Sequence, residues 1–323
     1  MSDKLLDIVI ITYNSQSDIS NLLDSLRLQT WRDFSITVID NFSQDKTRGI
    51  IKKNYPEVTL IKNNENNYFS PACNQGLKNT SAQYVLYCNP DMVIDKNALQ
   101  EFYNYFKTHP KFGSLGGKIY QLSMCKNKTE MLDSASIKIL SSLQAIDRGY
   151  NEKDSGQFEN VEQVFGHSGA FVLYNRKALN DIAINGEVFD NDFKMYKEDV
   201  DVAYRLNLRG WKNFYLPRVF AWHCRSINAK QNRKSRSVLI RRLSYTNHIL
   251  TIFKNIPCGI FMKHFLPFFW YEIKKKVYIL ILDWPVVPAL FAIVPGFFRM
   301  IKKRRQMPRR VINNSDLEKI IFG

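Results

Sequence analysis

The sequence predicts an α/β domain with a mostly parallel central sheet flanked by helices, followed by a helical extension rich in basic and aromatic residues. Apolar strands alternate with amphipathic helices through the first hundred residues, which is the pattern of βαβ units. The charge also changes along the chain. Residues 1–224 hold 26 Lys and Arg and 26 Asp and Glu, whereas residues 225–310 hold 19 and two. We therefore expect a neutral domain over 1–224, with halves 1–95 and 96–224, and a basic region over 225–323.

The first half contains four predicted strands separated by helices. Each strand is a short apolar run that ends in polar residues, and the first helix has Ile19, Leu22, Leu23 and Leu26 on one face. We expect strands at 7–12, 35–40, 58–61 and 84–88, and helices at 15–29, 45–54 and 70–78. Asp40 ends the second strand, where an open α/β sheet can offer a carboxylate to a base or ribose. An Asx turn with Asn41 and Ser43 explains Asp40 equally well.

The last of these strands ends abruptly in Asn89-Pro90-Asp91. Pro90 lacks a backbone N–H and so ends the hydrogen-bonded ladder. Asp91 is therefore presented at the carboxyl end of a central strand, where open α/β sheets bind their ligands.

The second half is less regular. We expect a helix at 97–108, a strand at 113–121, a strand within 165–174 and a helix at 175–181. Between them, residues 126–160 are polar and weakly patterned. We interpret this segment as an excursion with one or two strands beside an acceptor.

An acidic helix follows, from Glu198-Asp199-Val200-Asp201 to Gly210 as its C′ residue. Asp199 shares a helix face with Val202, Ala203 and Leu206, so it points inward, and a carboxylate there is costly unless it is used. Asp201 is four residues before Arg205, the spacing of a surface ion pair. A strand at 215–223 then ends in His223.

The sequence also excludes some classes of protein. It has no G-x-G-x-x-G after the first strand and no G-x-x-x-x-G-K-[ST], which disfavours dinucleotide dehydrogenases and P-loop enzymes. The five cysteines are odd in number and unclustered, as expected of reduced cytosolic thiols. We expect no cleaved signal peptide.

Seven segments in order resemble glycosyltransferase family 2, which has the GT-A nucleotide-diphospho-sugar transferase fold. They are Ile-Thr-Tyr-Asn14, Val-Ile-Asp-Asn41, Ala72-Cys-Asn-Gln-Gly76, Asn89-Pro-Asp91, Gly169-Ala170, Glu198-Asp-Val-Asp201 and Gly210-Trp211. The Asn-Pro-Asp variant and the acidic helix are most similar to a rhamnosyltransferase-type branch. The resemblance covers residues 7–225.

The resemblance implies a role for each matching residue. The nucleotide sugar is expected to contact Thr12, Tyr13, Asn14, Asp40, Asn41, Asn74, Gly76 and Asn89. Asp91 and His223 are expected to hold a divalent cation, Mg²⁺ or Mn²⁺, on the diphosphate. Asp199 is the expected catalytic base of an inverting reaction, with Glu198 beside it. Asn89 stands where the family commonly has an acid, which leaves Asp91 as the one carboxylate of the cation site.

The chemistry is consistent with these residue types. A leaving diphosphate needs neutralisation, which a cation with oxygen ligands supplies. The acceptor hydroxyl must lose a proton as it attacks, and a carboxylate near an apolar face has a pKa raised toward that task. The resemblance implies transfer of a sugar, with L-rhamnose from dTDP-rhamnose as the first hypothesis, in O-antigen- or capsule-type polysaccharide synthesis. A UDP-hexose or UDP-galactofuranose donor is the alternative.

The basic region contains two aromatic-rich segments, 256–271 and 277–298, and the second is long enough to span a bilayer. Asp283 and three prolines interrupt it, and basic residues flank it on both sides. We therefore expect a monotopic helix pair on the inner, cytoplasmic face of the membrane, with Trp270, Tyr271 and Trp284 at headgroup depth and basic clusters against anionic lipid. A helical cap packed on the first domain is the alternative.

A membrane-bound chain fits a lipid-linked saccharide acceptor. A nucleic-acid-binding protein is disfavoured because such a protein has no use for the apolar segment 277–298. A nucleotidyltransferase lacks its usual glycine-rich phosphate loop here, and a non-catalytic scaffold would not need Asp91 and Asp199.

Overall fold

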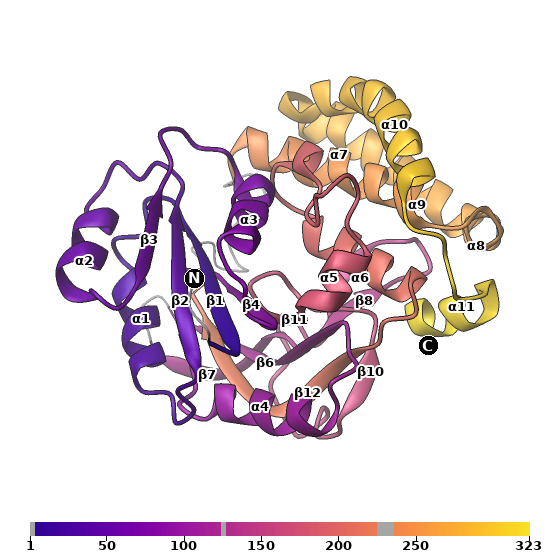
Figure 1. The fold of residues 1–323 in the computed structure, drawn as a ribbon. Coiled ribbons are helices and arrows are strands. Elements are labelled where there is room, and N and C mark those ends of the chain that lie inside the picture. The colour runs from indigo at the N-terminus through magenta and orange to yellow at the C-terminus, as the bar shows by residue number, and fades with distance from the viewer. Residues whose placement is uncertain (1–3, 124–126, 225–235) are drawn as a thin grey trace.

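The computed structural model describes residues 4–123, 127–224 and 236–323. Its first half is the predicted alternation of strands and helices (Figure 1). The elements are β1 (Leu6–Thr12), α1 (Ile19–Arg27), β2 (Phe34–Asp40), α2 (Thr47–Asn54), β3 (Thr59–Lys62), α3 (Phe69–Lys78), β4 (Tyr84–Cys88) and β5 (Met92–Ile94).

The second half begins with α4 (Ala98–Thr108) and β6 (Ser114–Leu122). The predicted excursion holds three strands instead of one or two, because short polar strands carry little periodic signal. They are β7 (Lys128–Ser134), β8 (Ile137–Ile139) and β9 (Ala145–Asp147). The remaining elements are β10 (Glu162–Val164), β11 (Phe171–Asn175), α5 (Arg176–Asp181), η1 (Asn191–Phe193), α6 (Glu198–Leu208) and β12 (Asn213–His223).

The main sheet has the order β10-β12-β6-β11-β4-β1-β2-β3. Strands β3, β2, β1 and β4 are parallel, as predicted. Beyond β4 the sheet is mixed: β11 is antiparallel to its neighbours, and β6 and β12 are parallel to each other. At the edge, β5 pairs with the end of β12.

Helices cover both faces of the sheet. Alternate β1 residues face opposite ways, with Ile8 and Ile10 in one core beside α1 and α4, and Val9 and Ile11 in a second core beside α3, α5 and α6. This is the period-2 pattern of a strand buried on both sides. Gly76 lies where α3 approaches β1, and a Cβ there would be 2.4 Å from Val9 Cγ1.

The C-terminal region is helical, as expected. It consists of α7 (Val238–Asn255), α8 (Cys258–Lys263), α9 (Phe265–Leu282), η3 (Trp284–Val286), α10 (Pro288–Gln306) and α11 (Asn314–Phe322). A third core joins these helices to the outer face of α6, including Val200 and Tyr204. Helix α6 therefore lies between the sheet and the C-terminal helices (Figure 1). The boundary predicted at residue 224 stays a prediction, although helices on both sides of it share one core.

Candidate active site

The end of β4 and the end of β12 meet beside a cavity. Asp91 follows Asn89-Pro90, and β5 then pairs with β12 so that Met92 lies opposite His223. The Cys224 N–H donates to the carbonyl of Asp91 at 2.9 Å. As a result, His223 Nε2 lies 3.2 Å from Asp91 Oδ1, although the two residues are far apart in sequence. The structure thus brings together the two residues predicted to hold a cation.

A third residue, Asp133 of β7, orients His223. The Asp133 Oδ2 atom lies 2.9 Å from His223 Nδ1, which leaves Nε2 toward the cavity. Burial alone would lower the pKa of His223, but the charges of Asp91 and Asp133 outweigh it and raise the pKa to about 9. Carboxylates behind a metal-binding histidine commonly fix its ring in this way. Sequence reasoning missed Asp133 because the excursion that carries it had no recognisable pattern.

Asp91 and His223 fit a divalent cation that takes its other ligands from phosphates. Among the described residues, no group of three or more His, Cys, Asp and Glu side chains is arranged to hold a metal by itself. The pair offers one carboxylate oxygen and, once His223 has released its proton, one imidazole nitrogen. An incomplete protein set of this kind suits ions such as Mg²⁺, which usually bind through one or two carboxylates plus substrate phosphates.

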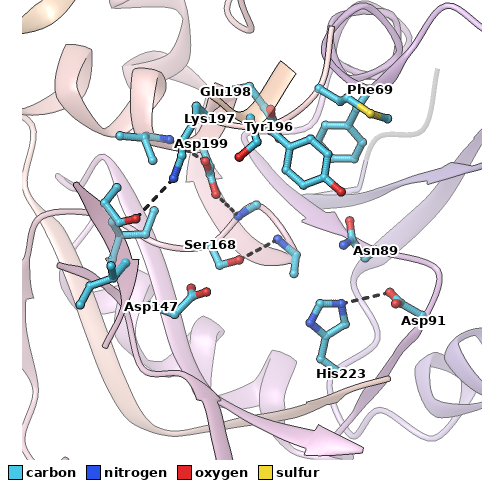
Figure 2. A pocket seen from close by; sticks show the side chains of 18 of the residues that line it. Phe69, Asn89, Asp91, Asp147, Ser168, Tyr196, Lys197, Glu198, Asp199 and His223 are labelled. Atoms are coloured by element: carbon cyan, nitrogen blue, oxygen red, sulfur yellow. Dashed lines mark hydrogen bonds and ion pairs between the residues drawn. The ribbon is translucent and has the colours of Figure 1, made fainter. Parts of the chain in front are cut away.

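The first turn of α6 forms the opposite side of the cavity (Figure 2). Asp199 Oδ2 accepts a hydrogen bond from the Gly169 N–H at 3.1 Å, and Oδ1 accepts one from the Val200 N–H at 2.8 Å. Burial raises the pKa of Asp199, although Lys197 and these two N–H groups act in the opposite direction. Asp199 therefore lies where an inward-facing base was predicted.

Glu198 is more deeply buried than its neighbour. Its side chain is 7% exposed, and Oε2 has no hydrogen-bond partner within the described parts of the chain. Burial first, and the adjacent Asp199 charge second, raise its pKa to about 8. Two neighbouring carboxyls share one site, so one of them holds a proton near neutral pH.

The prediction for Asp201 was wrong. It was expected to form a surface pair with Arg205, but both side chains are buried, with Asp201 fully inaccessible. Arg205 lies 2.7 Å from Asp201 Oδ2, and Lys254 Nζ and Asn255 Nδ2 of α7 lie 2.9 and 2.8 Å from Oδ1. The spacing of four residues predicted the correct partner, Arg205, but Lys254 and Asn255 of α7 cover the pair and bury it.

The cavity between these two sides has a volume of about 460 Å³. Five predicted site residues line it: Asn89, Asp91, Glu198, Asp199 and His223. Other lining residues were not predicted, including Phe69, Asp147, Ser168, Tyr196 and Lys197. Asp147 comes from β9, so the excursion contributes to the cavity, and its place beside an acceptor stays a prediction.

The residues predicted to contact the nucleotide lie outside this cavity, apart from Asn89. Asp40 is fully buried and accepts hydrogen bonds from Thr12 Oγ1 at 3.1 Å and the Ser43 N–H at 3.1 Å, and it pairs with Arg48. The Ser43 bond is the Asx turn weighed as the alternative. Tyr13 is half exposed at this edge, and Asn14 has a left-handed φ of 52°.

Asn41, Asn74 and Gly76 have structural contacts. Asn41 Oδ1 accepts from Asn63 Nδ2 at 3.1 Å and the Asn67 N–H at 3.0 Å, which fixes the polar loop after β3. Asn74 Oδ1 accepts from the backbone N–H groups of Val188 and Phe189, at 3.1 and 3.0 Å. Gly76 permits the close approach of α3 to β1. Their predicted contacts with a nucleotide stay predictions.

The fold and the two-sided cavity define the chain as a GT-A protein of the nucleotide-sugar transferase class. The model of glycosyl transferase family 2 matches residues 7–183, and the chain belongs to this family.

Curated relatives match the same part of the chain. The poly-beta-1,6-N-acetyl-D-glucosamine synthase of Staphylococcus epidermidis is 28% identical over 218 residues, which are 66% of this chain and 48% of the synthase. The synthase of the same name from Staphylococcus aureus strain COL is 26% identical over 217 residues, again 66% and 48%. The chain spans about half the length of the curated relatives it matches.

Solved structures show the fold. Residues 1–349 of S. aureus TarS align with a TM-score of 0.58 at 15% identity over 98% of this chain and 83% of that one. The same TarS fragment in complex with UDP-GlcNAc aligns with a TM-score of 0.57 at 16% identity, with the same coverage. The mannosyltransferase PcManGT of Pyrobaculum calidifontis, in complex with GDP-Man and Mn²⁺, aligns with a TM-score of 0.55 at 14% identity over 93% and 79%.

Proposed function

We propose that this chain is an inverting glycosyltransferase that moves a sugar from a nucleotide-diphosphate donor to a hydroxyl of a saccharide acceptor. One observation carries the proposal: the cavity has Asp91 and His223 on one side and the carboxyls of Glu198 and Asp199 on the other. Leaving group and nucleophile of a single displacement lie on opposite sides of the reacting carbon. The two sides of the cavity match those two positions.

Asp91 and His223 would hold a divalent cation, Mn²⁺ or Mg²⁺, against the donor diphosphate. Such a cation neutralises the charge that develops on a leaving diphosphate. Asp199 accepts the proton of the acceptor hydroxyl, because it faces the cavity and its two N–H bonds fix its carboxylate. Glu198, protonated at neutral pH, keeps the charge of the pair on Asp199.

The test of the reaction compares the wild type with one variant. Asp199→Asn is expected to lower transfer at least about 1,000-fold, because it removes the base while keeping the shape of the side chain. Binding of the nucleoside diphosphate, measured by calorimetry, should be unchanged. Turnover of Asp199→Asn near that of the wild type would show that Asp199 is not the base.

The donor has two candidates. The Asn89-Pro-Asp91 variant motivates dTDP-rhamnose, whereas the N-acetylglucosamine polymer made by the named relatives, and the UDP-GlcNAc bound to TarS, favour a UDP-linked hexose such as UDP-GlcNAc. Thermal stabilisation by dTDP-rhamnose, UDP-glucose, UDP-galactofuranose and UDP-GlcNAc, each with Mn²⁺ or Mg²⁺, separates them. A shift with dTDP-rhamnose alone supports the first candidate, and a shift with UDP-GlcNAc alone supports the second.

We also propose that the C-terminal helices lie on the cytoplasmic face of a membrane and that the acceptor is lipid-linked. Large apolar side chains are exposed along α9, η3 and α10, among them Trp270 (58%), Ile281 (71%), Trp284 (73%), Phe291 (72%) and Phe298 (68%). Residues Trp284–Gln306 are long and apolar enough to cross a bilayer by length and composition, which is weak evidence by itself. Exposed patches of this kind mark membrane or protein contact sites.

The basic clusters are only partly available to lipid. Lys303 pairs with Asp190, and Arg304 donates to the carbonyls of Phe253 and Ile256 at 2.8 and 2.7 Å. Arg299, Lys302 and Arg305 are exposed. The expected attraction to anionic lipid therefore comes from fewer charges than the sequence count indicates.

Co-sedimentation with vesicles tests the membrane contact. The wild type should sediment with anionic phosphatidylglycerol vesicles, and Trp284→Ser with Phe291→Ser should not. Leu28→Ser is the control because Leu28 is equally exposed, at 70%, but belongs to the N-terminal half. Equal sedimentation of the double variant and the wild type would contradict the proposed surface.

A further inference from the structure

The segment that leads into the acidic helix has an unusual backbone. Lys194, Tyr196 and Lys197 have φ values of 60°, 70° and 73°, in the left-handed region that non-glycine residues rarely adopt. Tyr196 and Lys197 line the cavity directly before Glu198 and Asp199. Such a conformation persists only where surrounding contacts determine it. Contacts with α7 hold this segment.

Asn247 of α7 supplies them. Its Nδ2 atom donates to three backbone carbonyls of this segment, those of Phe193 at 2.8 Å, Met195 at 2.9 Å and Tyr196 at 2.9 Å. The side chain of Asn247 is 1% exposed, so its amide group itself is shielded from water. The amide NH₂ has two hydrogens, so two of the three carbonyls share one of them, and an oxygen at this position would have no hydrogen to donate.

The same helix also contacts the chain after the two acids. Lys254 and Asn255 lie seven and eight residues beyond Asn247, about two helical turns, and both contact the carboxylate of Asp201. One side of α7 therefore binds the backbone before Glu198 and a side chain after Asp199. The two acids lie between these anchors.

Other residues of α7 contact the C-terminal helices. Thr246 donates to the carbonyl of Ala289 at 3.4 Å, and Arg242 donates to that of Pro285 at 2.7 Å. Arg241 pairs with Asp283. Helix α7 thus joins the acidic segment to η3 and α10, and it lies outside the residues that the family model matches.

We propose that Asn247 is a positioning residue for sugar transfer: it holds residues 193–197 in the conformation that directs Glu198 and Asp199 at the cavity. The expected effect of Asn247 on catalysis rests on the proposed function, whereas its contacts with the three carbonyls do not. Asn247 is not among the residues that line the cavity. It acts through the three carbonyls.

Steady-state kinetics of three variants test the role. Asn247→Leu keeps a similar shape but removes the donor, and Asn247→Ser keeps one shorter donor. Thr246→Val is the matched control, because it removes one buried hydrogen bond on the side of α7 that faces α10. We expect kcat to fall about 30- to 100-fold in Asn247→Leu and less in Asn247→Ser, with KM for the donor within about 3-fold. Thr246→Val should stay within about 2-fold.

Hydrogen exchange supplies a readout that needs no activity. Amides of residues 193–201 should exchange at least about 10-fold faster in Asn247→Leu than in Thr246→Val, while those of β1 stay unchanged. Unchanged exchange overturns the inference, and so does faster exchange with the kcat of the control. If the wild type transfers no sugar from any donor, the proposed function fails, and exchange alone decides whether Asn247 holds the segment.

Discussion

Replacing Glu198 with Gln should stabilise the fold at alkaline pH and change its stability little near pH 4.5. Burial first, and the charge of Asp199 second, raise the pKa of Glu198 from 4.5 to about 8. The folded chain therefore retains a proton that the unfolded chain releases between these two pH values. Because the folded state binds more protons in this window, its stability falls as the pH rises from 4.5 to 8. A neutral Gln removes that dependence.

The expected size follows from the two pKa values. They differ by about 3.5, and each unit is equivalent to about 1.4 kcal/mol, which sets a ceiling of about 5 kcal/mol above pH 8. Glu198 titrates together with Asp199, so removing one carboxyl also eases ionisation of the other. We therefore expect about 2–3 kcal/mol.

Urea unfolding of the wild type and Glu198→Gln at pH 5.0 and 8.5 measures the effect. The informative quantity is the change with pH of the difference between the two proteins, because a constant offset reports only how well the amide packs. Glu65→Gln, at an exposed glutamate, is the control. A difference that stays constant within about 0.5 kcal/mol between the two pH values would refute the assignment of a buried, protonated Glu198.

Three further changes address the cation site and the buried ion pairs. Asp91→Ala should abolish thermal stabilisation by donor plus Mn²⁺, because it removes the carboxylate of the pair; retained stabilisation would exclude Asp91 from the site. Asp133→Asn should weaken Mn²⁺ binding about 10-fold, since His223 loses the carboxylate that orients its ring; an unchanged Mn²⁺ titration would contradict this. Asp201→Asn should lower the free energy of unfolding by about 3 kcal/mol, because it breaks a buried ion pair; a loss below about 1 kcal/mol would show that the pair is dispensable.

The sequence alone predicted a feature correctly where that feature depends on a single helix or strand. Short apolar runs predicted the parallel strands, and Pro90 predicted where β4 ends and therefore where Asp91 is presented. Asp199 was predicted to point inward because its own helix has an apolar face there. Each of these inferences depends on neighbours within about ten residues, for which periodicity is a reliable guide.

It was insufficient where the partner lies on a distant element. Asp201 has Arg205 at the spacing of a surface pair, and only α7, some fifty residues later, buries it. Asp133 lies on a strand whose residues are too polar for its pattern to be recognised. Asn247 looks like an ordinary polar residue of a basic helix, because three backbone carbonyls have no sequence signal.

The position of α6 explains why so many charges near the site are internal. One side of this helix packs on the sheet through Val202 and Leu206, and the other packs on the C-terminal helices through Val200 and Tyr204. Covered on both sides, α6 exposes few of its polar residues to solvent, so those that are buried must find a partner in the protein or shift their pKa.

Asp201 and Glu198 illustrate the two outcomes. Asp201 has Arg205 and Lys254, and their charges lower its pKa against the effect of burial. Among the described residues no cation forms a salt bridge with Glu198, the charge of Lys197 lowers its pKa less than burial raises it, and its pKa rises. The two carboxyls differ because of what they meet. Asp201 meets Lys254 and Asn255 of the C-terminal helix α7. Glu198 lies four residues before Val202, which packs on the sheet, and its charge raises the pKa of the buried Cys73 and Tyr174 in that same core. Burial against an apolar core therefore keeps Glu198 neutral, whereas burial against α7 supplies the cation that keeps Asp201 charged.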